Sequence, residues 1–540
     1  MSDRVAPLTV DLPSSSGLHG TAEVVATVGF GLACAIGLIG AFVGLDSHGF
    51  WFDELFTARI IEPADPAELL ARLAADVHPP LYGLVLFAYS KLAGLSETGL
   101  RSFSAVAACV AVLLFIGAMR PFFSLPARLF GAAMATGSLF WFFQSQNARP
   151  YAFSLLISVG ILALALRLLA ERRDRTMPDR TTAGLAALVF IGAFVHFYLL
   201  YESLAVLIAL ALLRRDRRRA LAGIGLSLLA VMGLYVTLVT MTYSQANLES
   251  NWVRNDVTWY RLVLESCLHY ALGTAGAIAL VLCGVVFGFY RASSRVVIGN
   301  RAVSWGRFPL DPVTGLLIGV PIMVFAGSVV SSNLFTPNFF DRSFLILSPF
   351  LWAFAARLYD ESVAATPPPV RLALTLALSA VVLAMASIVV QRLPPDQPAL
   401  LYEPFRQSAD WIRGIDDCRG QVVPVLSTDR KDWYKPGYGE LVYRDIYGRH
   451  LDGFAQPRLV FVEDALSGNV PADLRAELAR RIAGQGCPIV AWSVHNMPFA
   501  TMTAATNALL PVQAPVEAED FTDGQTGYVM VLQRDSRKAP

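Results

Sequence analysis

Two adjacent acidic residues, Asp53 and Glu54, follow closely after a long uncharged apolar run that ends at Leu45. Carboxylates at a membrane surface are costly to place there without a role. One of them can act as a general base that takes a proton from an acceptor hydroxyl. The pair can also hold a divalent cation. The same residues equally suit the first turn of a solvated helix, where acidic side chains favour the helix dipole, so the residues alone leave these alternatives open.

A second polar cluster, Asp76 and His78, is followed directly by two prolines. Proline fixes φ and suits the first turn of a helix, so we expect a helix to begin there. Asp76 can cap this helix or orient His78. His78 can also join Asp53 and Glu54 as a ligand of Mg²⁺, Mn²⁺ or Zn²⁺, although a lone histidine is more often structural.

The sequence that must position these residues is too apolar for a soluble protein. Of its 540 residues, 55% are hydrophobic and 16% are charged, against about 25% charged residues in a typical globular protein. The run from Val24 to Leu45 is long enough to cross a hydrocarbon core of about 30 Å. The composition predicts a polytopic membrane protein. It shows no basic stripe interleaved with aromatic residues, so nucleic-acid binding has no support.

Charged clusters divide the apolar sequence into eleven predicted membrane spans. Arginine groups such as those in 172–180, 214–219 and 291–307 fall in alternate gaps, which the positive-inside rule assigns to the cytoplasm. This places the tail 1–23 in the cytoplasm and the C-terminus outside. The predicted spans are residues 24–45, 102–119, 129–145, 151–169, 182–197, 199–213, 220–241, 268–290, 312–332, 343–356 and 371–390.

Two stretches depend on this charge rule. The run from Leu81 to Leu95 is apolar but short, and a crossing there would move the arginine groups outside. We therefore predict an interfacial helix within a first outer loop at 46–100.

Residues 182–213 are long for one helix and short for two. The rule favours two short helices with a tight turn near His196–Glu202, and the turn can leave a depression in the outer surface.

The composition changes after Val390, where residues 394–540 become polar behind a proline-rich linker. Short apolar runs at 421–426, 458–462, 488–494 and 527–532 predict strands, and the periodicity of 473–482 predicts a helix. We expect a small soluble α/β domain outside the membrane. An oxidising compartment would permit a disulfide between its two cysteines, Cys418 and Cys487; two free thiols are the alternative.

Several motifs follow one another on the predicted outer side. They are Trp51–Glu54, Asp76 with His78–Tyr82, Gly94 with Ser96–Glu97, Leu100–Arg101 with Ser104, Ser145–Tyr151, His196–Tyr198, and Asp341–Phe344 with Pro349. Together, in this order, they resemble the bacterial integral-membrane glycosyltransferases with the GT-C fold, a group that contains the protein O-mannosyltransferases and the aminoarabinose transferase that modifies lipid A. The resemblance covers roughly residues 24–360 and implies an all-α GT-C transmembrane domain at 24–393, followed by the α/β domain.

The resemblance implies a glycosyltransferase that takes its sugar from a polyprenyl-phosphate donor. The acceptor would be a hydroxyl of an envelope lipid, a polysaccharide or a protein, at the outer face of the bacterial cytoplasmic membrane. Asp53 would be the base, with Glu54 beside it, and the anomeric carbon would be inverted. Arg149 and Arg342 would bind the donor phosphate, because arginine can bind phosphate bidentately; snorkelling at the interface is the alternative.

Other motif residues receive weaker assignments. Tyr151 belongs to the same motif as Arg149 and is expected in the donor site. His78, His196 and Glu202 are candidates for substrate contacts or metal ligation, with a structural role as the alternative. The chain departs from the family pattern at Asn147, where a glutamate is common, and at Ser343, where a tyrosine is common.

Two other functions are compatible with so many spans. One is a secondary transporter or lipid flippase, but the spans contain few charges, show no repeat between halves, and gather their polar residues at one face. The other is a working C-terminal domain that the helices only anchor, for which eleven spans are far more than anchoring requires. The sequence names neither the sugar nor the acceptor.

Overall fold

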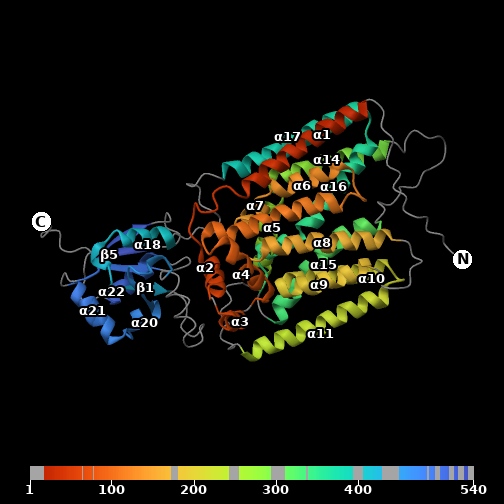
Figure 1. Cartoon of the computed structure of the whole chain (residues 1–540). Coiled ribbons are helices and arrows are strands. Elements are labelled where there is room, and N and C mark those ends of the chain that lie inside the picture. Colours follow the sequence, from red (N-terminus) through yellow and green to blue (C-terminus); the bar gives the residue numbers. More distant parts are fainter. Residues whose placement is uncertain are drawn as a thin grey trace, which may run out of the picture.

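The computed structural model consists of a helical bundle joined to a smaller domain that contains the sheet (Figure 1). The described residues are 18–63, 65–76, 78–171, 180–242, 255–293, 311–335, 338–392, 405–427, 449–482, 486–492, 499–509, 516–520 and 528–532.

Within the described residues, seven helices are long and apolar enough to cross a membrane, and the chain is a multi-pass membrane protein. They are α1 (Leu18–Gly40), α5 (Glu97–Ala118), α8 (Tyr151–Ala170), α11 (Arg218–Thr242), α14 (Gly273–Ser293), α15 (Pro312–Leu334) and α17 (Pro368–Gln391).

The remaining four predicted spans are shorter or more polar helices that lie among the long ones (Figure 1). They are α6 (Leu125–Thr136) with α7 (Leu139–Ser145), α9 (Arg180–Val195), α10 (Phe197–Leu213) and α16 (Ser348–Ala365). A further helix, α13 (Val257–Ala271), precedes α14.

Three of the predicted span boundaries are wrong. The first span ends at Gly40, and the turns after it include Gly44 at a positive φ of 75°. The run 129–145 is split between α6 and α7, where the Ser138 side chain caps α7 by accepting from the Trp141 N–H. The run predicted to begin at Ser343 starts as a 3₁₀ helix, η1 (Asp341–Leu347), before α16.

The stretch 182–213 does form two helices with a tight break. His196 separates α9 from α10 in an extended conformation (φ −158°, ψ 137°), and its Nδ1 accepts a hydrogen bond from the Tyr198 N–H. The histidine thus caps α10 in the way that an asparagine or serine usually does. The break brings His196 into the polar cluster described below.

Three short helices cover one end of the bundle, which we call the loop end: α2 (Phe52–Ile61), α3 (Pro66–Ala75) and α4 (Leu81–Ala93) (Figure 1). Helix α4 follows the two prolines as predicted. Its 13 residues span about 20 Å, which is too short to cross a hydrocarbon core. It packs on α5 and α2 instead.

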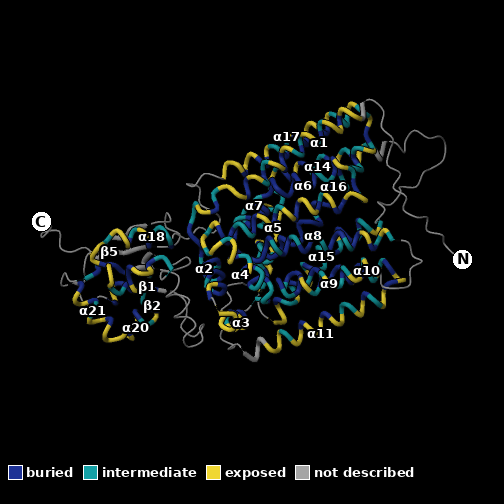
Figure 2. Tube along the Cα trace, in the orientation of Figure 1, coloured by how far each residue is buried: buried dark blue, intermediate teal, exposed yellow. Residues whose placement is uncertain are grey.

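Close helix contacts hold the bundle together, and the buried residues run along its axis (Figure 2). A Cβ added at Gly29 would lie 2.5 Å from the Ser379 hydroxyl of α17, and one at Gly37 would lie 2.5 Å from Thr136 of α6. Small residues at such positions let membrane helices approach closely. Large exposed apolar side chains on α1, α11 and α14 suit a lipid environment.

The smaller domain contains a five-stranded mixed sheet of order β2-β1-β3-β5-β4. Strand β1 is parallel to β2 and β3, whereas β5 is antiparallel to β3 and β4. Its elements are α18 (Phe405–Arg413), η2 (Asp416–Cys418), β1 (Val422–Ser427), β2 (Gln456–Phe461), α20 (Val462–Ser467), α21 (Ala472–Ile482), β3 (Ile489–Trp492), α22 (Phe499–Leu509), β4 (Val516–Asp520) and β5 (Tyr528–Leu532).

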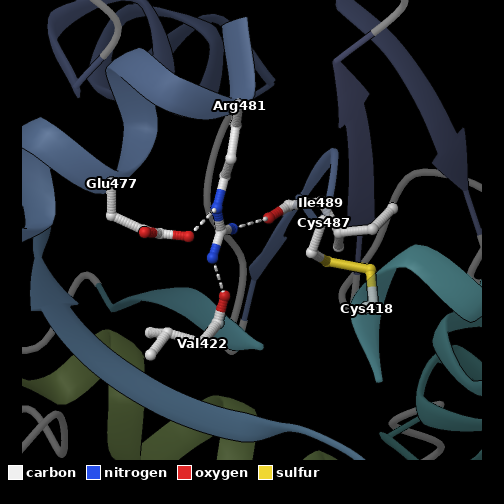
Figure 3. Close-up of a disulfide and its surroundings, with 6 residues drawn as sticks. All are labelled: Cys418, Val422, Glu477, Arg481, Cys487 and Ile489. Carbon is white, nitrogen blue, oxygen red and sulfur yellow. Dashed lines mark hydrogen bonds and ion pairs between the residues drawn. A yellow bond between two sulfur atoms is a disulfide. The ribbon is translucent and has the colours of Figure 1, made fainter. Parts of the chain in front are cut away.

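A buried disulfide between Cys418 and Cys487 joins η2 to the residues just before β3, so these cysteines are not free thiols (Figure 3). The Arg481 side chain lies nearby, where it pairs with Glu477 and donates to the backbone carbonyls of Val422 and Ile489. These contacts tie α21 to the sheet next to the disulfide.

Candidate active site

The first turn of α2 positions Asp53 and Glu54 differently, although they are neighbours in the sequence. Helix α2 begins after Trp51, directly beyond the segment that leaves α1. Consecutive residues of an α-helix are rotated by about 100°, so the two carboxylates point to different surroundings. Glu54 is fully buried, whereas 22% of the Asp53 side chain is exposed.

The Glu54 carboxylate is saturated by hydrogen bonds. Oε1 accepts from Arg101 Nε at 2.9 Å and from the Ala148 N–H at 2.7 Å, and Oε2 accepts from Arg101 Nη2 at 2.6 Å and from the Trp51 N–H at 3.3 Å. These four bonds use the roughly four acceptor positions of a carboxylate. These bonds make Glu54 the partner of a buried arginine and give no support to the prediction that it acts in catalysis or binds a metal.

Arg101 was named in the sequence motif without a role, and it has a clear structural one. Its guanidinium donates to Glu54 and also to the backbone carbonyls of Leu45, His48 and Gly49 at 2.8–2.9 Å. These bonds occupy all five N–H groups of the side chain. Arg101 thus fixes the segment that joins α1 to α2, and with it the start of α2. An arginine directly before a predicted span, beside an acidic outer loop, is the sequence signal that could have pointed to such a pair.

Asp53 lies between two arginines from distant parts of the chain. Its Oδ2 is 3.2 Å from Nη2 of Arg342, in η1, and 3.8 Å from Nη2 of Arg149, between α7 and α8. The structure therefore brings together the three residues that the sequence predicted as base and phosphate ligands.

Arg149 is held in place by several acceptors. Nη1 donates to the Asp53 carbonyl at 3.2 Å and to Thr57 Oγ1 at 2.9 Å, and Nη2 lies 3.3 Å from Nε2 of His78. Nδ1 of His78 is 3.0 Å from Asp76, so a ring protonated at Nδ1 satisfies both contacts. Burial lowers the pKa of Arg149, but Asp53 and Tyr151 more than offset it, and the pKa lies above its usual value.

Arg342 lies among aromatic rings and polar groups. Its guanidinium carbon is 5.3 Å from the centre of the Trp51 ring and 5.2 Å from that of Phe340, within the range of cation–π attraction. Burial lowers the pKa of Arg342, but Tyr151 and Asp53 outweigh this effect, so the side chain stays cationic. Trp51, a residue of the first sequence motif, lines the site beside Arg342.

His196 and Tyr151 complete the cluster. Their rings are 5.6 Å apart. Burial, together with the nearby positive charges of Arg149 and Arg342, lowers the pKa of His196 to about 3. His196 is thus a neutral ring at neutral pH. Glu202 lies elsewhere, within the bundle, where its Oε1 is 2.9 Å from the Ser158 hydroxyl.

The predicted metal ligands do not converge. Asp53 faces two guanidinium groups, Glu54 faces Arg101, and His78 lies between Arg149 and Asp76. A divalent cation beside Asp53 would be repelled by both arginines. Within the part of the chain that the structure describes, no three His, Cys, Asp or Glu side chains are grouped closely enough to hold a metal ion.

A cavity of about 280 Å³ adjoins this cluster. Trp51 and Arg342 lie on its wall, beside amide groups from the turn after α7 and the carboxylate of Asp341. Asn147 accepts from the Trp51 indole N–H at 3.1 Å and donates to Gln144 at 3.2 Å. The lining residues are Gly44, Leu45, Ser47, His48, Gly49, Trp51, Glu54, Arg101, Phe140, Phe143, Gln144, Gln146, Asn147, Tyr270, Asp341 and Arg342.

Two crystal structures of ArnT from Cupriavidus metallidurans have a similar fold over nearly the whole chain. The apo structure aligns with 95% of this chain and 98% of ArnT, at a TM-score of 0.56 and 13% identity. The structure bound to undecaprenyl phosphate aligns with 94% and 98%, at a TM-score of 0.55 and 12% identity. The chain has the GT-C fold. No protein-family model and no curated protein matches the sequence.

The GT-C fold explains why the cluster forms from such separated segments. Three segments meet at the loop end of the bundle: α2, the turn after α7, and η1. They contribute Asp53, Arg149 and Arg342, respectively. At 12–13% sequence identity, the likeness to ArnT shows the fold alone. Any chemistry of this protein depends on its own side chains.

Proposed function

We propose that this protein is a glycosyltransferase that moves a sugar from a polyprenyl-phosphate donor to an acceptor hydroxyl of the cell envelope. The observation that carries the proposal is the position of Asp53 between Arg149 and Arg342. A base and two phosphate-binding cations within 4 Å are the groups that this reaction needs. Polar groups buried at one end of a membrane bundle suit a donor whose tail lies in lipid and whose phosphate lies at the interface.

The shared fold supports the choice of donor. One of the ArnT structures is bound to undecaprenyl phosphate. In this chain the two arginines can bind the phosphate of such a lipid. Because the sugar is already activated by the lipid phosphate, a nucleotide-binding loop is not required.

The proposed reaction is a single displacement. The acceptor oxygen attacks the anomeric carbon from the face opposite the phosphate, and its proton passes to the Asp53 carboxylate. The bond between the anomeric carbon and the phosphate oxygen breaks, and its electron pair leaves with the lipid phosphate. Arg149 and Arg342 stabilise the charge that develops there. One displacement inverts the anomeric configuration.

The cavity beside the cluster is the proposed site of the sugar ring. It combines an aromatic side chain, Trp51, with the amide groups of Gln144 and Asn147, and it shares Arg342 with the base site. Apolar walls with a few fixed polar groups are typical of small-molecule sites. A ring in this cavity would lie beside both the phosphate ligand and the base.

The arginine clusters support an orientation for the protein. By the positive-inside rule they favour the loop end at the outer face of the bacterial cytoplasmic membrane, with the smaller domain on the same side. The disulfide between Cys418 and Cys487 supports this orientation, because disulfides persist in oxidising compartments. We therefore propose a catalytic transmembrane domain at 24–393 and an extracytoplasmic domain at 394–540.

The test is transfer by the purified protein in detergent, with a panel of polyprenyl-phosphate hexoses and pentoses. Envelope lipids, a polysaccharide fraction and envelope proteins are offered as separate acceptors. We expect mass spectrometry to detect free polyprenyl phosphate and a product heavier by one sugar. Asp53→Asn should slow the appearance of both by about 10²- to 10⁴-fold. In proteoliposomes, a flippase would move the sugar lipid between leaflets without breaking its sugar–phosphate bond, and that result would contradict the proposal.

A further inference from the structure

We propose that Asp53 and the lipid phosphate compete for the same two arginines, so that the base also limits how tightly donor and product are held. This inference rests on the proposed function and gives Asp53 a second role. Its basis is that the carboxylate is the present ion-pair partner of both Arg149 and Arg342, at 3.8 Å and 3.2 Å.

Exposure shows where a phosphate can enter. The side chains of Asp53 and Arg342 are 22% and 17% exposed, whereas that of Arg149 is 6% exposed and is fixed by the Asp53 carbonyl and Thr57. An arriving phosphate therefore reaches Arg342 first, on the side that Asp53 occupies. When the phosphate binds Arg342, the ion pair between Arg342 and Asp53 has to be shared with the phosphate or broken.

The charges show why sharing suits the reaction. Two guanidinium groups and one carboxylate leave the cluster with one positive charge, which the single negative charge of a donor phosphodiester neutralises. During transfer Asp53 takes up a proton while the leaving lipid phosphate gains a negative charge, up to about −2 in total at neutral pH. The negative charge facing the arginines thus moves from the carboxylate to the phosphate without changing in amount.

This exchange also favours release of the product. When Asp53 loses the proton again, its carboxylate reclaims the arginines and the phosphate loses part of its binding energy. The other ionisable groups around the pair are Asp76 and His78 beside Arg149, Asp341 beside Arg342, and Tyr151 and His196 packed against them. Glu54 cannot compete in this way, because Arg101 and two backbone N–H groups already occupy it.

The experiment measures the affinity of the purified full-length protein for undecaprenyl phosphate in detergent. Asp53→Asn removes the competing charge and keeps the side-chain size, and we expect it to bind the phosphate about 10- to 100-fold more tightly, although it transfers sugar much more slowly. Undecaprenol, which lacks the phosphate, should bind equally to both proteins. A variant that merely damaged the site would bind the phosphate less tightly.

Asp65→Asn is the matched control. Asp65 is an exposed residue of the same loop, and it caps α3 by accepting from the Ala67 N–H at 3.1 Å. Asparagine caps a helix equally well, so this variant removes one negative charge without touching the arginines. Its affinity for undecaprenyl phosphate should stay within twofold of wild type.

A second background keeps the test valid if Asp53→Asn does not fold. The double variant Asp53→Asn with Arg149→Gln has the same net charge in the cluster as the wild type, and it should bind undecaprenyl phosphate at least fivefold more tightly than Arg149→Gln alone. Equal or weaker binding when Asp53 is replaced would overturn the competition while leaving the proposed function intact. If the wild type bound undecaprenyl phosphate no better than undecaprenol, the proposed function would fall, and the competition with it.

Discussion

Two carboxylates of one helical turn, Glu54 and Asp53, have opposite surroundings. Glu54 is fully buried and bonded to an arginine of a bundle helix, and that arginine in turn holds the backbone before α2. Asp53 is partly exposed, and it faces two arginines from other segments at longer distances of 3.2 and 3.8 Å. The first pair satisfies all its hydrogen-bonding groups, whereas the second can still accept a ligand.

The difference separates a structural ion pair from the one to which we assign the reaction. A buried pair whose groups are all satisfied resists exchange, because breaking it leaves an uncompensated charge in a medium of low dielectric constant. A partly exposed carboxylate can exchange partners at lower cost. The rotation of about 100° between neighbouring helical residues therefore allows one dipeptide to fix the loop and to supply the proposed base.

Replacing Asp53 should have the largest effect on activity. Asp53→Asn removes the base, so we expect the rate of sugar transfer to fall by about 10²- to 10⁴-fold. The variant should remain folded, because Arg342 is partly exposed and the buried Arg149 keeps its bonds to the backbone carbonyl of residue 53 and to Thr57. Turnover at saturating donor is the measurement, with Asp65→Asn as the control. Near-normal turnover would remove Asp53 from the role of base.

Replacing Glu54 should instead affect stability. Glu54→Ala leaves the buried Arg101 without its counter-charge, which costs about 3–5 kcal/mol when one partner of a buried pair is removed. We expect a large fall in the thermal unfolding midpoint in detergent, and less folded protein on expression. The double variant Glu54→Ala with Arg101→Met should lose less than Glu54→Ala, because it leaves no unpaired charge. A Glu54→Ala protein as stable as wild type would contradict the comparison.

The sequence predicted much of this arrangement, because the signals are local. Apolar run lengths and arginine clusters located the helices, and the pattern of 473–482 located α21. Strand β4 was missed because Val516–Asp520 contains three acidic residues in five. The roles of Asp53 and Glu54 could not be separated in this way. They depend on partners about 50 to 290 residues away, Arg101, Arg149 and Arg342, and on which face of α2 each carboxylate occupies.

The two arginines beside Asp53 should differ in what their loss does. Arg342→Gln removes the more exposed cation, and we expect affinity for undecaprenyl phosphate to fall about 10- to 100-fold with little change in stability. Arg149→Gln should lower affinity as well, but it also removes the bonds that Arg149 donates to Thr57 and to the Asp53 carbonyl, so the unfolding midpoint should fall too. Titration and thermal unfolding of both proteins check this. Unchanged affinity in both variants would place the phosphate elsewhere.

The smallest effect is expected at His78, whose ring contacts Arg149 beside Asp53. Its Nε2 contact with Arg149 is long, at 3.3 Å, and a single hydrogen bond of this kind contributes about 0.5–1.5 kcal/mol. His78→Ala should therefore lower undecaprenyl phosphate affinity by about two- to tenfold. His78→Gln, which can still offer an acceptor to Arg149, should recover part of the loss. A metal ligand would behave differently. If His78→Ala abolished activity, and a chelator did the same to the wild type until Mg²⁺, Mn²⁺ or Zn²⁺ was restored, His78 would belong to a metal site. A metal ion, and not the two arginines alone, would then be the cation that acts beside Asp53.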